Sequence, residues 1–161
     1  MSATVKRKDP KAVERVYSRL GQTAGREVAV GFPRGKVQAY PESGQGVAEV
    51  AARHVYGVGV PERNFMGQAQ AGIVQETRSL MRAAARAGQG GDEEGSRALL
   101  EAAGAKAANE IKLAIRDGDF EPLSERTIER RAEEGRPSTK PLIDTAHMIT
   151  HVTWAVRKRG G

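Results

Sequence analysis

The chain has 161 residues, which is enough for one domain with a real core and too few for two large ones. Hydrophobic residues make up 39% and charged residues 29%, a balance that fits neither a membrane-embedded chain nor a plainly disordered one. The absence of cysteine excludes a disulfide framework and any Cys-ligated metal site, whereas the net charge of +6 is compatible with nucleic-acid binding.

The N-terminal part is predicted to be a basic segment followed by a short helix. Residues 1–10 are polar and basic with no apolar run behind them, so we expect neither a signal peptide nor a membrane span. Asp9 and Pro10 are typical of a helix start, and an apolar face follows to Leu20. Residues 26–32 then alternate as a strand, and residues 33–46 carry two prolines and three glycines, which predicts a long loop or hairpin arm.

The middle of the chain is predicted to be helical. Residues 47–56 form a short helix that Gly57, Gly59 and Pro61 end. From Phe65 the apolar residues recur every three or four positions, and the same spacing returns up to Ile115. Residues 88–95 (GQGGDEEG) are expected to be a flexible turn between the two helices, which implies an antiparallel pair with many alanines between them.

The last part is predicted to return to the sheet. Ser124 is typical of a cap for a charged helix to about Glu134, and Asp144 or Thr145 is expected to start one helical turn before a strand at residues 152–156. The predicted fold is α+β, with two long antiparallel helices and shorter helices packed on a small, mostly antiparallel sheet. We expect a single domain over residues 1–161, with a mobile basic segment at 1–8, the long loop at 33–46 and a basic tail at 157–161.

Nothing in the sequence points to enzyme chemistry, and we expect no catalytic, cofactor-binding or metal-binding residues. His147 and His151 lie four apart, as two helical metal ligands would, but position 148 is Met where metalloprotease motifs carry glutamate. No Gly-x-Ser-x-Gly elbow surrounds a serine, and no phosphate-binding loop is present. With few aromatics, the chain also lacks a stacking platform for single-stranded nucleic acid.

Three segments in order carry a family resemblance. They are the strand ending Val30-Gly31-Phe32 with its Gly-rich loop, then VAEVAARHVYGVGVPERNFM at residues 47–66, then PLSERTIERR…KPLIDTAHMITHVTWAV at residues 122–156. This order resembles the virion-morphogenesis and tail-completion proteins of the neck region of tailed phages, over about residues 26–157. The chain departs from that pattern at Asn64, where the family often has Pro, and at Ala146, where it often has Gly.

The resemblance implies a structural protein of the virion neck or upper tail, made in the host cytoplasm. It implies a homo-oligomeric ring, most simply a hexamer because related tails are sixfold, that meets head-closure, tail-terminator or tail-tube proteins and the passing DNA, with no membrane contact. Candidate assembly contacts are Tyr40, Phe65, Arg157, Lys158 and Arg159. Candidate structural anchors are Phe32, Ile143, Asp144 and Trp154, the last as a core residue of the final strand.

Three other functions stay open on the sequence. Head closure or tail termination is not separated from tail completion by any residue pattern. A basic nucleic-acid-binding protein is the rival from another class, because lysine and arginine gather at both ends of the chain. A small hydrolase, built on Ser124, Asp144 and a histidine, ranks third.

Overall fold

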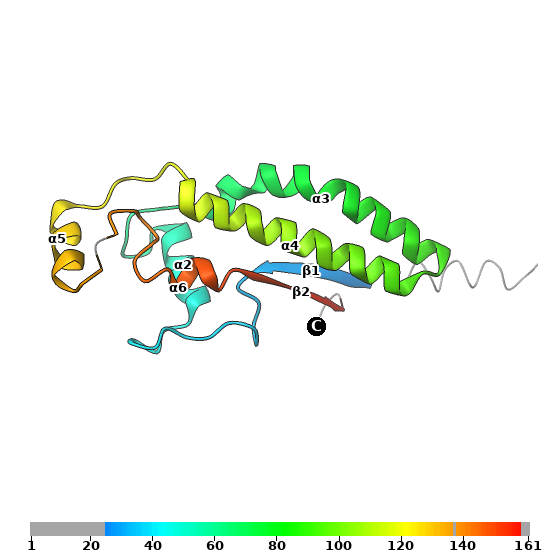
Figure 1. The fold of residues 1–161 in the computed structure, drawn as a ribbon, viewed down its shortest axis with the longest axis horizontal. Coiled ribbons are helices and arrows are strands. Elements are labelled where there is room, and N and C mark those ends of the chain that lie inside the picture. The colour runs from blue at the N-terminus through cyan, green and yellow to red at the C-terminus, as the bar shows by residue number, and fades with distance from the viewer. Residues whose placement is uncertain (1–24, 137, 159–161) are drawn as a thin grey trace, which may run out of the picture.

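The computed structural model describes residues 25–136 and 138–158, and within them it shows an elongated α+β fold (Figure 1). The predicted fold class is therefore confirmed. In chain order the elements are β1 (Arg26–Gly31), α2 (Val47–Tyr56), α3 (Phe65–Gly90), α4 (Glu93–Asp117), α5 (Glu125–Glu133), α6 (His147–Thr150) and β2 (Thr153–Lys158). The helix predicted to begin at Asp9 lies outside the described residues.

The sheet joins the two ends of the described chain. β1 and β2 pair antiparallel, with Arg26 opposite Lys158 and Gly31 opposite Thr153. Both strands pack against α4, so that the long helices form one layer and the strands another (Figure 1). A two-stranded sheet is marginal by itself in water, and here the helix layer supplies the apolar surface that stabilises it.

The two long helices form the antiparallel pair that the apolar spacing predicts. Their connection is shorter than expected, because α3 continues to Gly90 and only Gly91 and Asp92 separate the helices. Gly91 takes a left-handed conformation that closes α3, and the side chain of Asp92 accepts a hydrogen bond from the backbone N–H of Gly95 at 2.8 Å. The predicted flexible turn at 88–95 is thus wrong: most of it is the end of one helix and the capped start of the next.

Small residues let α4 lie close to its neighbours. Its buried positions recur at helical spacing and are Ser96, Leu100, Ala103, Gly104, Ala107, Ala108, Ile111 and Ile115. Gly104 lies directly under the indole of Trp154, where an added Cβ would clash with the ring. Trp154 therefore packs on the helix layer as predicted, although it is only partly buried and its indole N–H donates to Glu101 at 2.7 Å.

The main core lies where α3 and α4 meet the segment that follows α5. Its buried residues are Val47, Ala51, Phe65, Ala69, Ala108, Ile111, Ile115, Leu142, Met148 and Val152. Phe32 and Ile143 are partly buried and pack against this cluster, which fits their predicted role as anchors. The expected helical turn starts later than Asp144 or Thr145, at His147, because Ala146 before it is held in a left-handed conformation.

Residues 33–46 form a long, mostly exposed loop, as predicted, and part of it folds back on itself (Figure 1). Ala39 and Gly46 form an isolated antiparallel bridge, and the backbone N–H of Tyr40 donates to the carbonyl of Gln45 at 2.9 Å. Val37 and Tyr40, the two apolar anchors seen in the sequence, both pack against the core cluster. The loop thereby places Tyr40 and Glu42 beside α6, at the end of the molecule where α5 lies (Figure 1).

Candidate functional site

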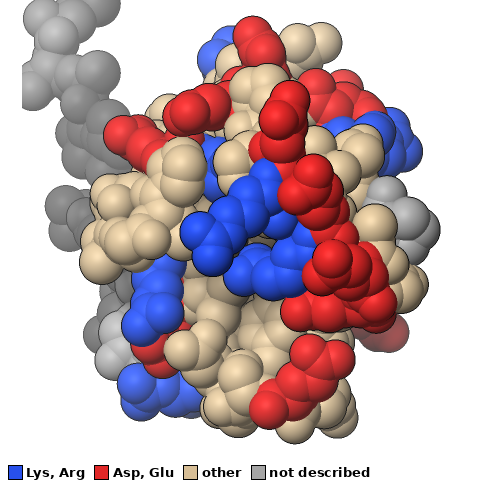
Figure 2. Space-filling model, turned by 90° about the vertical axis from the view of Figure 1, so that its left-hand side faces the viewer, with Lys and Arg blue, Asp and Glu red and all other residues tan. Residues whose placement is uncertain are grey.

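A pocket of about 240 Å³ opens at the α5 end of the molecule. Segments far apart in the sequence form it: the loop at 33–46, α2, Arg63 just before α3, Leu123 and α5, and the segment from Arg136 into α6. Its lining residues are Tyr40, Glu42, Ser43, Gln45, Val50, His54, Arg63, Leu123, Arg131, Arg136, Leu142, Asp144, Thr145, Ala146, His147 and Met148. Figure 2 shows Lys and Arg side chains gathered around a hollow in the middle of this end, with Asp and Glu side chains beside them.

Arg131 is the structural centre of this end. It lies on the inner face of α5, one turn after Ile128, and only 8% of it is exposed. Its Nη1 lies within hydrogen-bonding distance of the carbonyls of Ser138, Lys140 and Ile143, at 3.0, 3.1 and 3.2 Å. Because one guanidinium gathers three carbonyls, it holds the loop after α5 against the helix.

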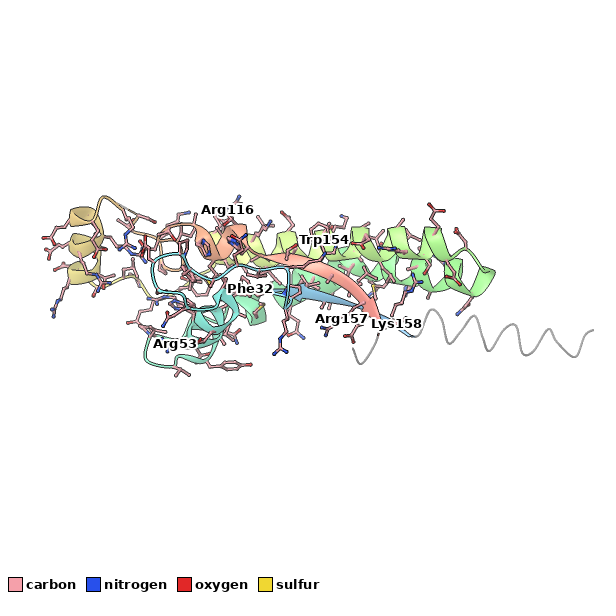
Figure 3. All side chains as sticks on the ribbon, turned by 90° about the horizontal axis from the view of Figure 1, so that it is seen from below. Phe32, Arg53, Arg116, Trp154, Arg157 and Lys158 are labelled. Atoms are coloured by element: carbon pink, nitrogen blue, oxygen red, sulfur yellow. The ribbon has the colours of Figure 1, made fainter. Side chains whose placement is uncertain are left out.

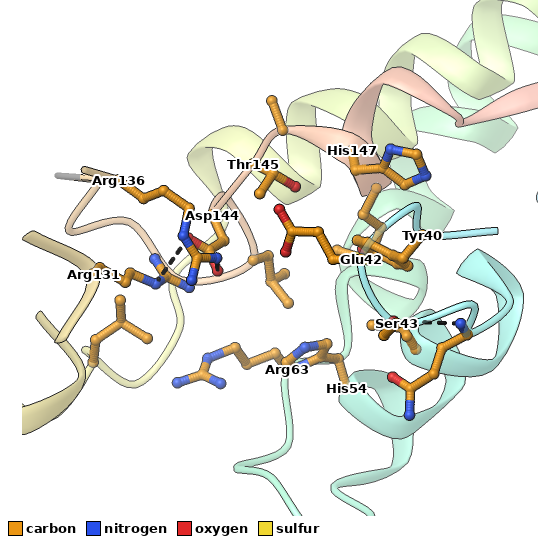
Figure 4. Close-up of a pocket in the computed structure, with 16 residues that line it drawn as sticks. Tyr40, Glu42, Ser43, His54, Arg63, Arg131, Arg136, Asp144, Thr145 and His147 are labelled. Carbon is orange, nitrogen blue, oxygen red and sulfur yellow. Dashed lines mark hydrogen bonds and ion pairs between the residues drawn. The ribbon is translucent and has the colours of Figure 1, made fainter. Parts of the chain in front are cut away.

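Asp144 bridges Arg131 and a second arginine. Arg136 Nη1 donates to Asp144 Oδ2 at 2.5 Å, and Arg131 Nε lies 3.4 Å from Asp144 Oδ1 (Figure 4). Arg136 also pairs with Glu134 outside the pocket. Asp144 lies between two non-glycine residues with positive φ, Leu142 at 63° and Ala146 at 57°. Such backbone is costly for residues with a Cβ, so the contacts around Asp144 hold a strained turn in place.

Arg63 lies on another wall of the pocket and is bound differently. It is 4% exposed, its Nη2 donates to the carbonyl of Glu121 at 3.2 Å, and its Nε has no hydrogen-bond partner. Among the described residues no carboxylate lies within ion-pair distance of it. Burial lowers the pKa of Arg63 from its ordinary value; the charge of Glu121 raises it, and that of Arg131 lowers it further.

His54 lies beside Arg63 in the same wall (Figure 4). Burial lowers the pKa of His54, and the charges of Arg63 and Arg131 lower it further. The imidazole is therefore held in its neutral form at pH 7, and its Nδ1 has no hydrogen-bond partner.

Aromatic rings close the side of the pocket opposite the arginines. The rings of Tyr40 and His147 lie 4.4 Å apart between centroids, and those of His147 and His151 lie 4.0 Å apart. Burial raises the pKa of Tyr40, and the charge of Asp144 raises it further. The rings of the two histidines thus contact one another at a tilt. No group of three or more potential metal ligands occurs in the part of the chain that the structure describes.

The charges that line the pocket leave a positive excess. Three arginines, Arg63, Arg131 and Arg136, face two carboxylates, Glu42 and Asp144, so the arginines exceed the carboxylates by one. Asp144 is engaged with Arg131 and Arg136, and Glu134 outside the pocket also pairs with Arg136, whereas Arg63 has no ion pair among the described residues and only the charge of Glu121 acts on it. This arrangement can bind an anionic group; it places no nucleophile beside a base that would activate it.

The predicted assembly contacts have different surroundings. Phe65 is 0% exposed and lies in the core, so its prediction as an assembly contact is wrong: the ring at the start of α3 fills the space under α2 and α6. Tyr40 is partly buried in the pocket wall. Arg157 pairs with Glu27 across the sheet at 2.7 Å, Lys158 is exposed at the end of β2 (Figure 3), and Arg159 lies outside the described residues.

The structure also exposes large apolar side chains that the sequence did not single out. Tyr56, at the end of α2, is 76% exposed and Val58, in the turn that follows, is 61% exposed. Val74 and Met81 on α3 are 44% and 43% exposed. Tyr56 and Val58 flank Gly57, whose left-handed conformation ends α2 and turns both side chains away from the core.

Sequence reasoning missed the pocket arginines. Arg131 stands in a segment so rich in charge that it reads as an ordinary surface residue, and Arg63 stands in the sequence Pro61-Glu62-Arg63, which reads as a turn before a helix. A weak signal was present for Arg131, since it follows Ile128 by three positions and so shares the apolar side of α5. For Arg63 the sequence gives only its place in that motif, and the fold shows that its side chain reaches the carbonyl of Glu121.

Comparisons with protein families, with curated proteins and with solved structures give no match to this chain. None of the helices in the described ranges is long and apolar enough to cross a membrane. The resemblance to phage neck proteins therefore stays a prediction from the sequence. What the structure adds is that two of its three segments, which contribute Arg63 and Asp144, line the same pocket.

Proposed function

We propose that the protein is a structural subunit of a tailed-phage virion, in the neck or upper tail, where it joins head to tail as part of a ring. The observation that carries the proposal is the exposed apolar pair Tyr56 and Val58, 76% and 61% exposed. These two large apolar side chains lie on either side of Gly57 on the surface, and a contact between chains that buried them would gain hydrophobic free energy.

The shape of the molecule supports the same proposal. The subunit is long and thin, with its two-stranded sheet on one side of α4 (Figure 1). Among the described residues β1 pairs only with β2, so the other edge of β1 keeps backbone groups available to a neighbour. An apolar groove lined by Val28, Val30, Ile73 and Met81 runs beside that edge. A second copy of the chain in a ring would cover the groove, and sixfold symmetry is what the resemblance implies.

The order of the family-like segments gives further support. In the sequence Arg63 and Asp144 are 81 positions apart, and each belongs to a short motif rich in turn-forming residues. In the fold both line one pocket and help hold the α5 end together. Motifs of this kind position chain segments, which is the task of a structural protein.

Gene deletion tests the proposal. Deleting the gene from the phage or prophage that encodes the chain is expected to leave DNA-filled heads and separate tails, which electron microscopy of the lysate distinguishes. Supplying the wild-type chain restores joined particles. The double variant Tyr56→Ser, Val58→Ser should fold but fail to restore them, while Val74→Ser, an exposed apolar residue on another face, serves as the matched control. A normal yield of joined particles without the gene would refute the proposal.

A nucleic-acid-binding protein is the rival that a specific observation favours. Lys158, which belongs to the predicted basic tail at 157–161, is exposed at the end of β2, although Arg157 beside it is already paired with Glu27. If this rival holds, the isolated chain binds duplex DNA with an affinity that falls steeply with salt, and Lys158→Gln lowers the salt dependence by about one unit of slope. The virion role predicts weak DNA binding by the single subunit.

A further inference from the structure

We propose that the pocket between Arg63, Arg131 and Arg136 binds a carboxylate group, supplied by an aspartate or glutamate side chain of another polypeptide chain. The inference goes beyond the virion role and does not depend on it. It rests on a buried arginine whose N–H groups are not all used, on the three arginines that line the pocket, and on the size of the pocket.

Arg63 is the residue whose unused hydrogen-bond donors indicate a ligand. A guanidinium has five N–H groups, and here the structure shows one hydrogen bond, from Nη2 to the carbonyl of Glu121. At 4% exposure the remaining groups have little water, and Nε is completely without a partner. A buried, unpaired charge is costly to the fold, and a bound anion would remove that cost.

No side chain of the described residues forms an ion pair with Arg63, although the charge of Glu121 acts on it. Asp144 is engaged elsewhere: its Oδ2 accepts a hydrogen bond from Arg136, and its Oδ1, which has no hydrogen-bond partner, lies 3.4 Å from Arg131 Nε. The carboxylate of Glu42 points into the same space (Figure 4), and among the described residues no ion pair joins it to an arginine. His54, with its lowered pKa, is neutral and leaves its Nδ1 without a partner beside Arg63. Figure 4 shows these side chains arranged around one open space.

The charge and the size favour a carboxylate over a phosphate. Two carboxylates line the pocket with the three arginines, and Glu134 pairs with Arg136 from outside it, so little positive charge is left for a ligand, which suits a singly charged group better than a doubly charged one. At about 240 Å³ the space is smaller than the roughly 300–1,000 Å³ of pockets that take drug-sized ligands. It admits the end of one side chain, whereas the phosphates of duplex DNA lie on a convex backbone that cannot enter it. A guanidinium also matches the planar carboxylate with two parallel hydrogen bonds.

Nuclear magnetic resonance of the full, ¹⁵N-labelled chain tests the proposal directly. The Nε–H signal of Arg63 is identified by its absence from Arg63→Gln. Titration with acetate at constant ionic strength, balanced with chloride, should shift the Arg63 signal saturably, with a dissociation constant on the order of millimolar. A blocked glutamate should act in the same way. Acetate should also shift the Nε–H signal of Arg136, and Arg63→Gln should abolish that shift.

Three further variants make the test sharper. Glu42→Gln removes a negative charge from the mouth and should tighten acetate binding about two- to fivefold. Arg136→Gln, at a less buried arginine, should weaken binding and replaces Arg63→Gln if that variant does not fold. Arg82→Gln, on the exposed face of α3, is the matched control and should leave binding unchanged.

Two outcomes would overturn the proposal. One is the absence of any saturable shift of a pocket arginine up to about 100 mM acetate. The other is a saturable shift with inorganic phosphate or a short DNA duplex but not with acetate, which would assign the pocket to a phosphate. Both outcomes are independent of whether the chain joins heads to tails.

Discussion

The two ends of the molecule are stabilised by different chemistry. Along α3, α4 and the two strands, buried alanines, leucine and isoleucines fill the space between elements, and Gly104 lets Trp154 approach the helix. At the α5 end the loops are held by Arg131, which contacts three carbonyls, and by Asp144, which joins two arginines. The first region is stabilised by close apolar packing, and the second by the hydrogen bonds and ion pairs of arginine side chains.

This difference shows where the fold has freedom to interact. The face that α3 and α4 share is packed within the subunit, whereas the groove beside β1 and the exposed side chains of Val74 and Met81 leave apolar surface uncovered. The polar end leaves polar atoms without hydrogen-bond partners, at His54, Arg63, Asp144 and His147, and these are the groups that a neighbouring chain could satisfy. We therefore expect mutations in the helical region to change stability and mutations at the α5 end to change stability and binding together.

The largest effect is expected at the centre of the apolar region. Phe65→Ala should lower the free energy of unfolding by about 3–5 kcal/mol, because it removes a fully buried ring and leaves a cavity. Urea unfolding followed by circular dichroism measures the change. Val74→Ala, at an exposed apolar residue of the same helix, should cost much less. Similar losses for the two variants would show that Phe65 is not a core residue.

A smaller loss of stability is expected when Arg131 at the α5 end is replaced. Arg131→Met should lower the free energy of unfolding by about 1–3 kcal/mol, since the carbonyls of Ser138, Lys140 and Ile143 lose their donor. Arg130→Met changes the adjacent, exposed arginine of α5 in the same way and should be nearly neutral. If the two variants unfold at the same urea concentration, Arg131 does not tie the loop.

One substitution should stabilise the charged end. Ala146 has a φ of 57°, a conformation that glycine adopts without strain, so Ala146→Gly should raise the free energy of unfolding by up to about 1 kcal/mol. The same change at Ala98, an exposed position inside α4, should lower it by about 1 kcal/mol. Opposite signs for one chemical change are the expected result in thermal unfolding, and equal signs would contradict the strained turn.

The smallest effect is expected from His54. Because the pKa of His54 in the folded chain lies below the ordinary 6.5, at acidic pH the unfolded chain binds a proton at this residue more readily than the folded chain does. His54 therefore costs nothing above about pH 6.5 and destabilises the fold progressively as the pH falls below that value. His54→Gln should flatten the loss of stability between pH 7.5 and 5.5. An unchanged slope would mean that His54 titrates normally.

Periodicity in the sequence predicted α3, α4 and both strands well, because apolar residues recur on the face of each element that packs against the core. It failed at the connection of the long helices, because Asp92 and Gly91 act as caps within a segment that reads as flexible. Phe65 was misplaced for a related reason: position in a motif does not show whether a ring points inward.

The pocket could not be predicted, and the reason is physical. Arg131 and Arg63 are buried through hydrogen bonds to backbone carbonyls from distant segments, and those partners are set by the fold and not by the residue types. Asp144 was predicted as an anchor from its motif, and it does bridge Arg131 and Arg136. Of its two partners, only Arg131 carries a sequence signal, the weak one of its spacing from Ile128.

Electron cryomicroscopy of the assembled phage particle tests the central claim most directly. The density of the long helix pair α3 and α4 is distinctive enough to place the subunit. The account predicts a ring of copies on the head–tail axis, with Tyr56 and Val58 covered by a neighbouring chain. A single copy, a position away from that axis, or particles that lack the chain would contradict it.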